Sequence, residues 1–150
     1  MYLIAKRPMN PSSEEDRENL EERLKEARMW DGEAEVSKDE VVKEVAYWRK
    51  ANAVHKWFVE NVQDGEDQNG EETPVTRSQL RDLLSICQTV INDKTLAKKL
   101  LPTQCGFFFG STNYDDCYFK KIQYTVDFLE EIEEDEELHE NWTLYYRSSW

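Results

Sequence analysis

The chain has 150 residues, of which 34% are charged and 39% are hydrophobic, and its formal net charge is −13. A chain of this length predicts one domain that buries about 70% of the surface exposed by its unfolded state. The negative charge argues against nonspecific binding to nucleic acid or to anionic membranes, because both require basic surface. No apolar run approaches the roughly 20 residues of a membrane span, and the N-terminal segment lacks a signal-peptide pattern.

The three cysteines, Cys87, Cys105 and Cys117, are odd in number and have no CxxC spacing. This favours reduced thiols in a cytosol over a secreted disulfide scaffold. Only two histidines are present, and neither HExxH nor a paired Cys/His spacing occurs. We therefore expect neither a metal site nor a cofactor.

The N-terminal part of the chain predicts a strand followed by a peripheral helix. Residues 1–7 mix apolar and polar residues over a strand's length before two prolines, which favours an edge strand. Ser12 and Ser13 precede three acids, a pattern typical of a helix N-terminus. The apolar stripe of this helix is thin, and residues 30–32 end it.

A long central helix is the main predicted element. Ser37 and Glu40 form an S-x-x-E capping box, which predicts the helix start. From Val41 to Val62 the apolar and aromatic residues fall on two adjacent stripes, as for a helix buried on more than one side. Gly65 would be its C-terminal stop.

Residues 64–73 predict an acidic loop, and the capping box of Thr76 and Gln79 then opens a strongly amphipathic helix through Ile91. A further short helix is expected to end at Pro102.

The last part of the chain predicts one more helix and a closing strand. Ser111 or Thr112 would cap a helix that runs to Ile132. We expect its acidic end, Glu130–Glu140, to be frayed, because like charges at a helix C-terminus oppose the dipole. Residues 142–150 are aromatic and predict a strand.

These elements predict an α+β fold, mainly α, with three to five helices around the long central helix. The N- and C-terminal strands would form a small sheet that buries Tyr2 and Ile4 against Leu144 and Tyr146. We expect a single domain over residues 1–150. Residues 1–36 would be a variable N-terminal strand and peripheral helix, and residues 37–150 the core that bears the motifs.

The predicted central helix carries polar side chains that are typical of a site. Trp48, Asn52 and His55 would share one face, and buried Asn and His side chains without partners cost about 1–3 kcal/mol each. In one interpretation both are hydrogen-bonded core residues. In the other, Trp48 or Tyr47 stacks on a ring while Asn52 and His55 hydrogen-bond to its edge.

The segment Leu101–Asp116 has the composition of a partner to that helix. It contains three consecutive phenylalanines between two glycines, and neighbours in an extended chain point to opposite faces. At least one of them, with Phe108 as the candidate, would cover a ligand, a partner chain or a neighbouring helix. Ser111 and Thr112 would either contact phosphate at a helix N-terminus or only cap their own helix.

Enzyme chemistry has less support, because no G-x-S-x-G motif or metal motif is present. We assign no catalytic residue. His55 is the best single candidate for a base, and it would need Asp115 or Cys105 brought close by the fold.

Three stretches, YWRKANAVHKWFVENVQDG, LLPTQCGFFFGSTNYDD and the terminal YYRSSW, resemble a widespread family of small uncharacterised proteins of bacteriophages and prophages. The resemblance spans Val41 to Trp150 and leaves Ser12–Val36 particular to this chain. It implies a setting, the cytoplasm of an infected bacterial host, rather than a reaction. Where the family pattern has Asp-Cys-Gly, residues 68–70 read Gln-Asn-Gly, which argues against a role for a loop cysteine.

The first hypothesis is an intracellular phage protein of counter-defence or host takeover that sequesters a small nucleotide-like ligand. Aromatic rings would stack, amide and imidazole groups would hydrogen-bond, and hydroxyls and arginines would meet phosphate. The candidate residues are Tyr47, Trp48, Arg49, Asn52, His55, Phe108, Ser111, Thr112, Tyr114, Asp115 and Arg147. A homo-oligomer with the phenylalanine segment at subunit contacts would suit sequestration.

Two alternatives stay open. The acidic blocks Glu66–Glu72 and Glu130–Glu140 could mimic nucleic-acid charge and inhibit a host defence protein such as a CRISPR effector. The chain could also be a small enzyme of phage nucleotide metabolism that uses His55. None of the three hypotheses requires a cofactor, direct binding to nucleic acid or a membrane.

Overall fold

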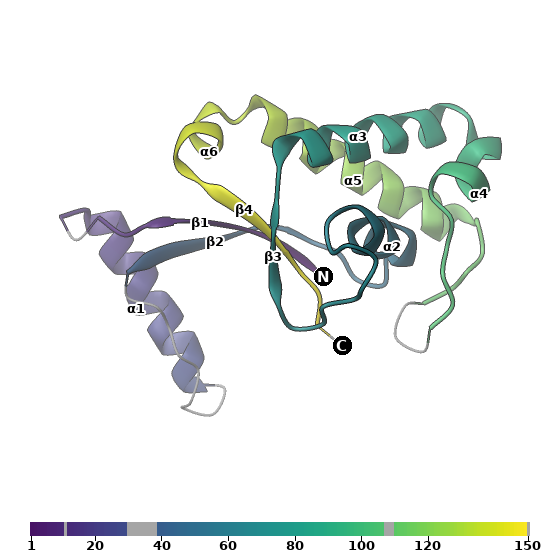
Figure 1. Ribbon diagram of the computed structural model, residues 1–150. Coiled ribbons are helices and arrows are strands. Elements are labelled where there is room, and N and C mark those ends of the chain that lie inside the picture. The colour runs from purple at the N-terminus through teal and green to yellow at the C-terminus, as the bar shows by residue number, and fades with distance from the viewer. Residues whose placement is uncertain (11, 30–38, 107–109, 150) are drawn as a thin grey trace.

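The computed structural model describes residues 1–10, 12–29, 39–106 and 110–149. They contain a four-stranded antiparallel sheet and six α-helices (Figure 1). The strands are β1 (Tyr2–Pro8), β2 (Glu40–Tyr47), β3 (Glu72–Val75) and β4 (Thr143–Arg147), in the order β2-β1-β4-β3. The helices are α1 (Glu14–Met29), α2 (Asn52–Asn61), α3 (Arg77–Asn92), α4 (Ala97–Leu100), α5 (Asp116–Glu134) and α6 (Glu136–Asn141), with a 3-10 helix, η1 (Lys94–Leu96), before α4. The α+β class and the pairing of the N- and C-terminal strands are confirmed.

Strand β1 is an inner strand and not the predicted edge strand, because β2 and β4 pair with its two sides. Its register also differs by one residue from the predicted one. Instead of Tyr2 and Ile4, the residues opposite Tyr146 and Leu144 are Leu3 and Ala5. Since side chains alternate between the two faces of a strand, Leu3 and Ala5 therefore point into the core, where both are fully buried.

The predicted central helix is wrong in its first half. Residues 40–47 form β2, and α2 begins only at Asn52, after a turn in which Lys50 has a φ of 57°. The valines of this segment favour a strand, because β-branched side chains pack well on a pleated surface. An irregularity in the pairing with β1, between Leu3 and Ile4, breaks the alternation that would have marked the strand. Ser37 of the predicted capping box lies outside the described residues.

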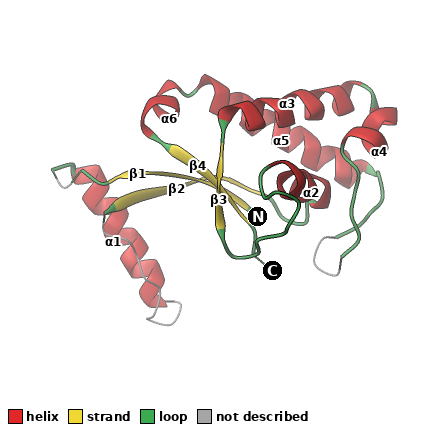
Figure 2. Ribbon diagram, in the orientation of Figure 1, coloured by secondary structure: helices red, strands yellow, loops and turns green. Residues whose placement is uncertain are grey.

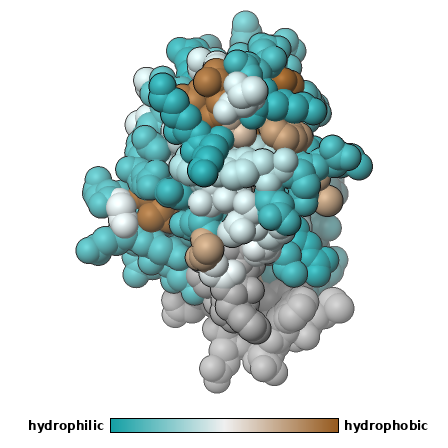
Figure 3. Space-filling view, turned by 90° about the vertical axis from the view of Figure 1, so that its right-hand side faces the viewer, coloured by the Kyte–Doolittle hydropathy of each residue, from teal (hydrophilic) through white to brown (hydrophobic). Residues whose placement is uncertain are grey.

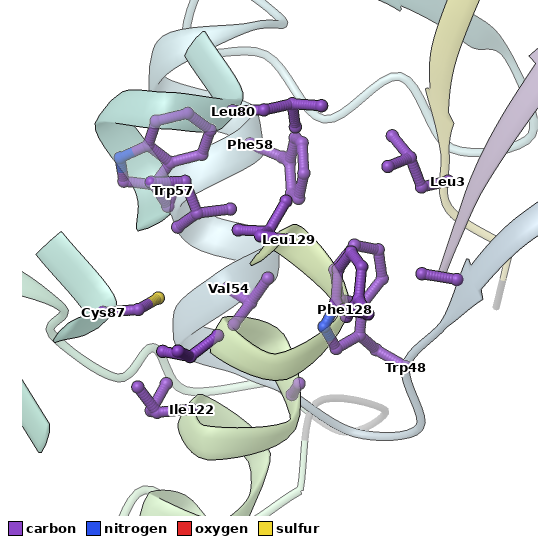
Figure 4. Packing of buried hydrophobic residues seen from close by; sticks show 14 of the residues in the cluster. Leu3, Trp48, Val54, Trp57, Phe58, Leu80, Cys87, Ile122, Phe128 and Leu129 are labelled. Atoms are coloured by element: carbon purple, nitrogen blue, oxygen red, sulfur yellow. The ribbon is translucent and has the colours of Figure 1, made fainter. Parts of the chain in front are cut away.

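Helices α2, α3 and α5 pack over one face of the sheet, with α3 beside α5, whereas α1 lies at the other end of the sheet (Figures 1 and 2). The core between them contains side chains from the sheet and from α2, α3 and α5, as Figure 4 shows for Leu3, Phe58, Leu80 and Leu129. The ring of Phe58 stacks on that of Tyr146 with 4.0 Å between centroids. This stack joins α2 to β4.

Helix α3 begins as predicted. Gln79 N donates a hydrogen bond to Thr76 Oγ1 at 3.3 Å, and Thr76 N donates to Gln79 Oε1 at 2.8 Å, so the capping box is complete. The loop before it is shorter than expected, because residues 72–75 form β3 and pair with β4.

Helix α5 begins later than predicted and does not fray at its end. Asp115, rather than Ser111 or Thr112, caps it by accepting a hydrogen bond from Tyr118 N at 3.0 Å. The acidic segment continues α5 to Glu134, and Asp135 then caps α6. Buried Ile132 and Leu138 hold these acidic helices on the core, which outweighs the unfavourable charge at the helix end.

The first helix is joined to the sheet by a partly buried ion pair. Arg7 donates two hydrogen bonds to the carboxylate of Asp16, at 2.8 and 2.5 Å, and Asn10 N donates a third at 2.7 Å. These bonds lower the pKa of Asp16, whose side chain is buried. The guanidinium of Arg7 also lies 4.8 Å from the ring of Trp142, so β1, α1 and the start of β4 meet at this arginine.

In the parts of the chain that the structure describes, no helix has the length and apolarity to cross a membrane.

Candidate functional site

The two stretches predicted to form a site lie next to each other, at the turn between β2 and α2 and in the segment before α5. Asn52 Nδ2 donates a hydrogen bond to the carbonyl oxygen of Ser111 at 2.8 Å. Lys121 Nζ donates to the carbonyl oxygen of Lys50 at 2.7 Å. Gly110 has a φ of 85°, and a Cβ there would lie 3.1 Å from the Cβ of Lys50, so the close approach favours glycine. The fold therefore brings both motifs together.

A surface groove of about 300 Å³ opens between this turn and the outer side of α5. We call it the Tyr47–Tyr124 groove, after the two rings at its walls, which are 43% and 45% exposed. Among the described residues these are the two large hydrophobic side chains that are exposed. The lining residues are Tyr47, Trp48, Arg49, Ala51, Cys117, Lys120, Lys121 and Tyr124.

Three cations line this groove in a chain that carries a net charge of −13. Within the described parts of the chain, neither the Arg49 nor the Lys120 side chain has a hydrogen bond or an ion pair. Lys121 is held by its bond to the carbonyl oxygen of Lys50. Cations without partners beside exposed rings provide the two contacts that an anionic aromatic ligand needs, charge attraction and stacking.

A smaller cavity lies beside the groove, under Asn52 and the segment before α5, and it shares Ala51, Cys117 and Lys121 with the groove. Its accessible volume is about 20 Å³, which is room for about one water molecule. The predicted contacts of Asn52, Ser111 and Asp115 with a ligand would have to be made in this cavity. Of these two neighbouring sites, the groove is therefore the one with space for a ligand of nucleotide size.

Trp48 lies in the core beneath the groove. Its side chain is 2% exposed, and the rings of Phe58 and Phe128 lie 5.6 and 4.9 Å from it, in edge-on contact (Figure 4). Its indole nitrogen donates a hydrogen bond to Thr125 Oγ1 at 2.9 Å. This packing leaves no open ring face, so Trp48 supports the groove floor and does not stack on a ligand.

His55 lines neither the groove nor the small cavity and is fully buried between α2 and β4. Its Nδ1 lies 2.7 Å from the hydroxyl oxygen of Tyr146, and its Nε2 lies 3.5 Å from Asp67 Oδ2. Ser148 Oγ in turn donates to Asp67 Oδ1 at 3.3 Å. Burial lowers the pKa of His55 to about 4, although the Asp67 carboxylate opposes this change. Neutral His55 therefore shares a hydrogen bond with Tyr146 in a structural network that holds the acidic loop, and it has no access to a substrate.

The remaining candidates have local roles or lie elsewhere. The Tyr114 hydroxyl accepts a hydrogen bond from Thr103 N at 3.1 Å, and Thr112 O accepts one from Thr103 Oγ1 at 3.0 Å. Because Asp115 occupies the N-cap of α5, an anion at this helix end would face a carboxylate, and the predicted phosphate contact there lacks support. Arg147 is on β4, two strands away from the groove. Phe108 lies outside the described residues.

Five of the groove residues are absent from the candidates proposed from the sequence, namely Ala51, Cys117, Lys121, Lys120 and Tyr124. The last two, Lys120 and Tyr124, provide a cation without a partner among the described residues and an exposed ring. They lie four residues apart on α5 and outside its buried stripe, so they share the outer face of the helix. The sequence contained one signal for this site, because Tyr124 is an aromatic residue that lies away from the apolar stripe of an amphipathic helix.

Among the described residues, the end of the molecule near α4 shows no broad apolar patch. In Figure 3 hydrophilic residues dominate this face, and the hydrophobic residues form small, separate patches. The phenylalanine segment proposed for subunit contacts, residues 107–109, lies outside the described residues.

Comparison of the chain with known protein-family models, with curated proteins and with solved structures finds no match. The groove itself therefore carries the functional argument.

Proposed function

We propose that this protein binds a small anionic aromatic ligand, of the kind and size of a nucleotide, in the Tyr47–Tyr124 groove. The observation that carries the proposal is the placement of two exposed tyrosine rings beside Arg49 and Lys120, whose side chains have no partner among the described residues. A volume of about 300 Å³ is at the lower end of the range for small-molecule sites.

The chemistry of the groove assigns each residue a part in binding. Tyr47 and Tyr124 offer ring faces for a base, and the planar guanidinium of Arg49 can bind two phosphate oxygens at once. Lys120 adds a second positive charge one turn before Tyr124 on α5. Asn52 acts indirectly, because its amide fixes the segment before α5 through Ser111.

Binding without turnover is the form of this proposal that the site supports best. The candidate base His55 is fully buried and bonded to Tyr146, so it would not reach a ligand in the groove. In the phage setting that the sequence motifs imply, a binder of this kind would sequester a nucleotide signal of the host's defence. Such a protein needs affinity and abundance, and it needs no catalytic group.

A thermal-shift screen and calorimetry with mononucleotides test the proposal on three proteins: the wild type, Arg49→Gln and the control Lys43→Gln. Lys43 is an exposed cation on β2 that does not line the groove. A ligand at 100 times its Kd should add about 2.7 kcal/mol of stability, which corresponds to a Tm increase of roughly 5–10 °C. Arg49→Gln should weaken binding by about tenfold, equivalent to about 1.4 kcal/mol, and Lys43→Gln should not. Silence across the nucleotides, or equal effects of the two variants, would refute the proposal.

A second candidate function gains support from the order of the acidic segment. Glu130, Glu131 and Glu134 are exposed on α5, and Glu136 and Glu140 are exposed on α6. Acids on helices that are packed on the core can present a fixed pattern of negative charge to a basic groove on another protein. This arrangement suits an inhibitor of a host defence protein such as a CRISPR effector.

Charge removal separates the two candidates. Replacement of Glu131, Glu134 and Glu140 by glutamine should weaken binding of such a partner and reduce the salt dependence of that binding. Arg49→Gln should leave binding of the partner unchanged. Capture that survives the glutamine substitutions would exclude the charge-mimic function.

A further inference from the structure

The aromatic surface of the groove continues past Tyr47 onto the sheet. The rings of Tyr47 and Tyr2 lie 5.0 Å apart between centroids, with their planes tilted by 39°. Tyr2 stands opposite Tyr47 on β2 and opposite Arg147 on β4. Directly opposite residues of an antiparallel pair point to the same face, so these three side chains form one row across three adjacent strands.

This row lies on the face of the sheet that turns away from the helices. Leu3, the next residue of β1, is fully buried and stands opposite Tyr146, which is also fully buried. Because neighbouring side chains alternate, Tyr2 points to the other face. Strands are about 4.8 Å apart, so the row extends roughly 10 Å from β2 to β4.

The far end of the row carries another cation without a partner. Arg147 is exposed, and within the described residues its guanidinium has no hydrogen bond or ion pair. Glu72 stands opposite Arg147 on β3, but its carboxylate pairs with Lys6 instead. The row of tyrosine rings thus has a cation at each end. Arg49 and Lys120 lie at the groove end, and Arg147 lies at the other end.

We propose that the ligand is a dinucleotide, two aromatic bases joined through phosphate. One base stacks in the Tyr47–Tyr124 groove with phosphate on Arg49 and Lys120, and the second base stacks on Tyr2 with its phosphate on Arg147. This inference rests on the proposed function and names its ligand class. A mononucleotide leaves Tyr2 and Arg147 unused, whereas a second stacked base raises affinity roughly 5- to 150-fold.

Calorimetry with AMP, with the linear dinucleotide pApA and with its cyclic form tests the inference. The wild type should bind at least one dinucleotide at least tenfold more tightly than AMP, and the comparison of linear with cyclic shows which form the row accepts. Arg147→Gln and Tyr2→Val should each bring this ratio close to one and leave the Kd for AMP within about twofold. The control Lys43→Gln should keep the full ratio, and unfolding curves of each variant establish that it folds.

The outcomes separate this inference from the proposed function. If AMP binds and Arg49→Gln weakens it, while no dinucleotide binds more tightly than AMP, only the dinucleotide proposal fails. The same holds if the ratio survives both Arg147→Gln and Tyr2→Val. If AMP and the dinucleotides all fail to bind, both proposals fall. Because Arg147 is exposed, Arg147→Gln gives a decisive result even if Tyr2→Val proves unstable.

Discussion

Lowering the pH should remove the stability that neutral His55 gives to the fold. In the unfolded chain this imidazole takes up a proton as the pH falls through its ordinary pKa of 6.5, but in the fold burial lowers its pKa to about 4. Between these values the unfolded state binds more protons than the folded state. The contribution of His55 is therefore complete above pH 6.5 and is lost as the pH falls toward 4.

The size of this effect follows from the difference between the pKa of His55 in the unfolded state and its pKa in the folded state. One pKa unit corresponds to about 1.4 kcal/mol, so a pKa that drops from 6.5 to about 4 corresponds to a loss of about 3 kcal/mol. For a domain whose total stability is about 5–15 kcal/mol, this is a large share.

Urea unfolding of the wild type and of His55→Phe, measured from about pH 7.5 to about pH 4, isolates the histidine. The phenylalanine variant loses the bond to Tyr146 but does not titrate at this position. Carboxylates common to both proteins contribute almost equally to the two curves. The advantage of the wild type over the variant should therefore shrink by about 3 kcal/mol as the pH falls through this window.

The alternative is that folded His55 is protonated and ion-paired with Asp67, 3.5 Å away. Its pKa would then be raised, and the advantage of the wild type would grow as the pH falls. A constant or growing advantage would thus refute a neutral His55. Asp67→Asn is a second check, because removal of the carboxylate should lower the pKa of His55 further.

Three further substitutions test the fold. Asp16→Asn should cost about 3 kcal/mol in urea unfolding and expose α1 to proteolysis, because Arg7 loses its carboxylate partner; unchanged stability would contradict the account of this ion pair. Trp48→Phe should cost about 1–3 kcal/mol through the lost bond to Thr125 and the cavity that remains, yet weaken nucleotide binding less than Arg49→Gln does. Thr76→Ala should lower stability by about 1 kcal/mol, whereas Thr112→Ala, at a residue that caps no helix, should change it by less than about 0.5 kcal/mol; equal effects would refute the assigned caps.

The elements that could be predicted from the sequence are those whose signals are local. Helix α3 has a capping box and apolar residues at helical spacing within one short segment, and both Thr76 and Gln79 behave as expected. The pairing of β1 with β4 could be predicted because the two chain ends are strand-forming segments, whereas most of the chain between them has helical patterns. Its register does not follow, because the choice between Leu3 and Tyr2 as the buried residue depends on the core that the helices complete.

Strand β2 shows why local patterns fail elsewhere. Its apolar residues Val41 and Val45, with Trp48 just after the strand, also match a helical stripe, and a break in the pairing with β1 hides the two-residue period. The segment becomes a strand because β1, some forty residues earlier, offers an unpaired edge. Such a partner is a property of the whole fold, and no short window of sequence contains it.

Part of the candidate site could also be predicted from the sequence. Tyr47 and Arg49 belong to a stretch rich in aromatic and polar side chains, so they stand out in the sequence. Lys120 and Tyr124 face them only because α5 packs across the end of β2, with Phe128 against Trp48. Composition can mark residues that are unusual, but tertiary packing decides which of them point outward together.

The charge of the rest of the molecule bears on how long an anionic ligand can be. Interactions between exposed charges fade over a Debye length of about 8 Å at physiological salt, so a ligand confined to the tyrosine row interacts mainly with its nearby cations. A longer nucleic-acid strand would extend beyond them over a surface whose net charge is −13, and each further phosphate would be repelled. The same acidic surface that excludes nonspecific nucleic-acid binding therefore favours a short ligand, one or two nucleotides long, over a polymer of the same units.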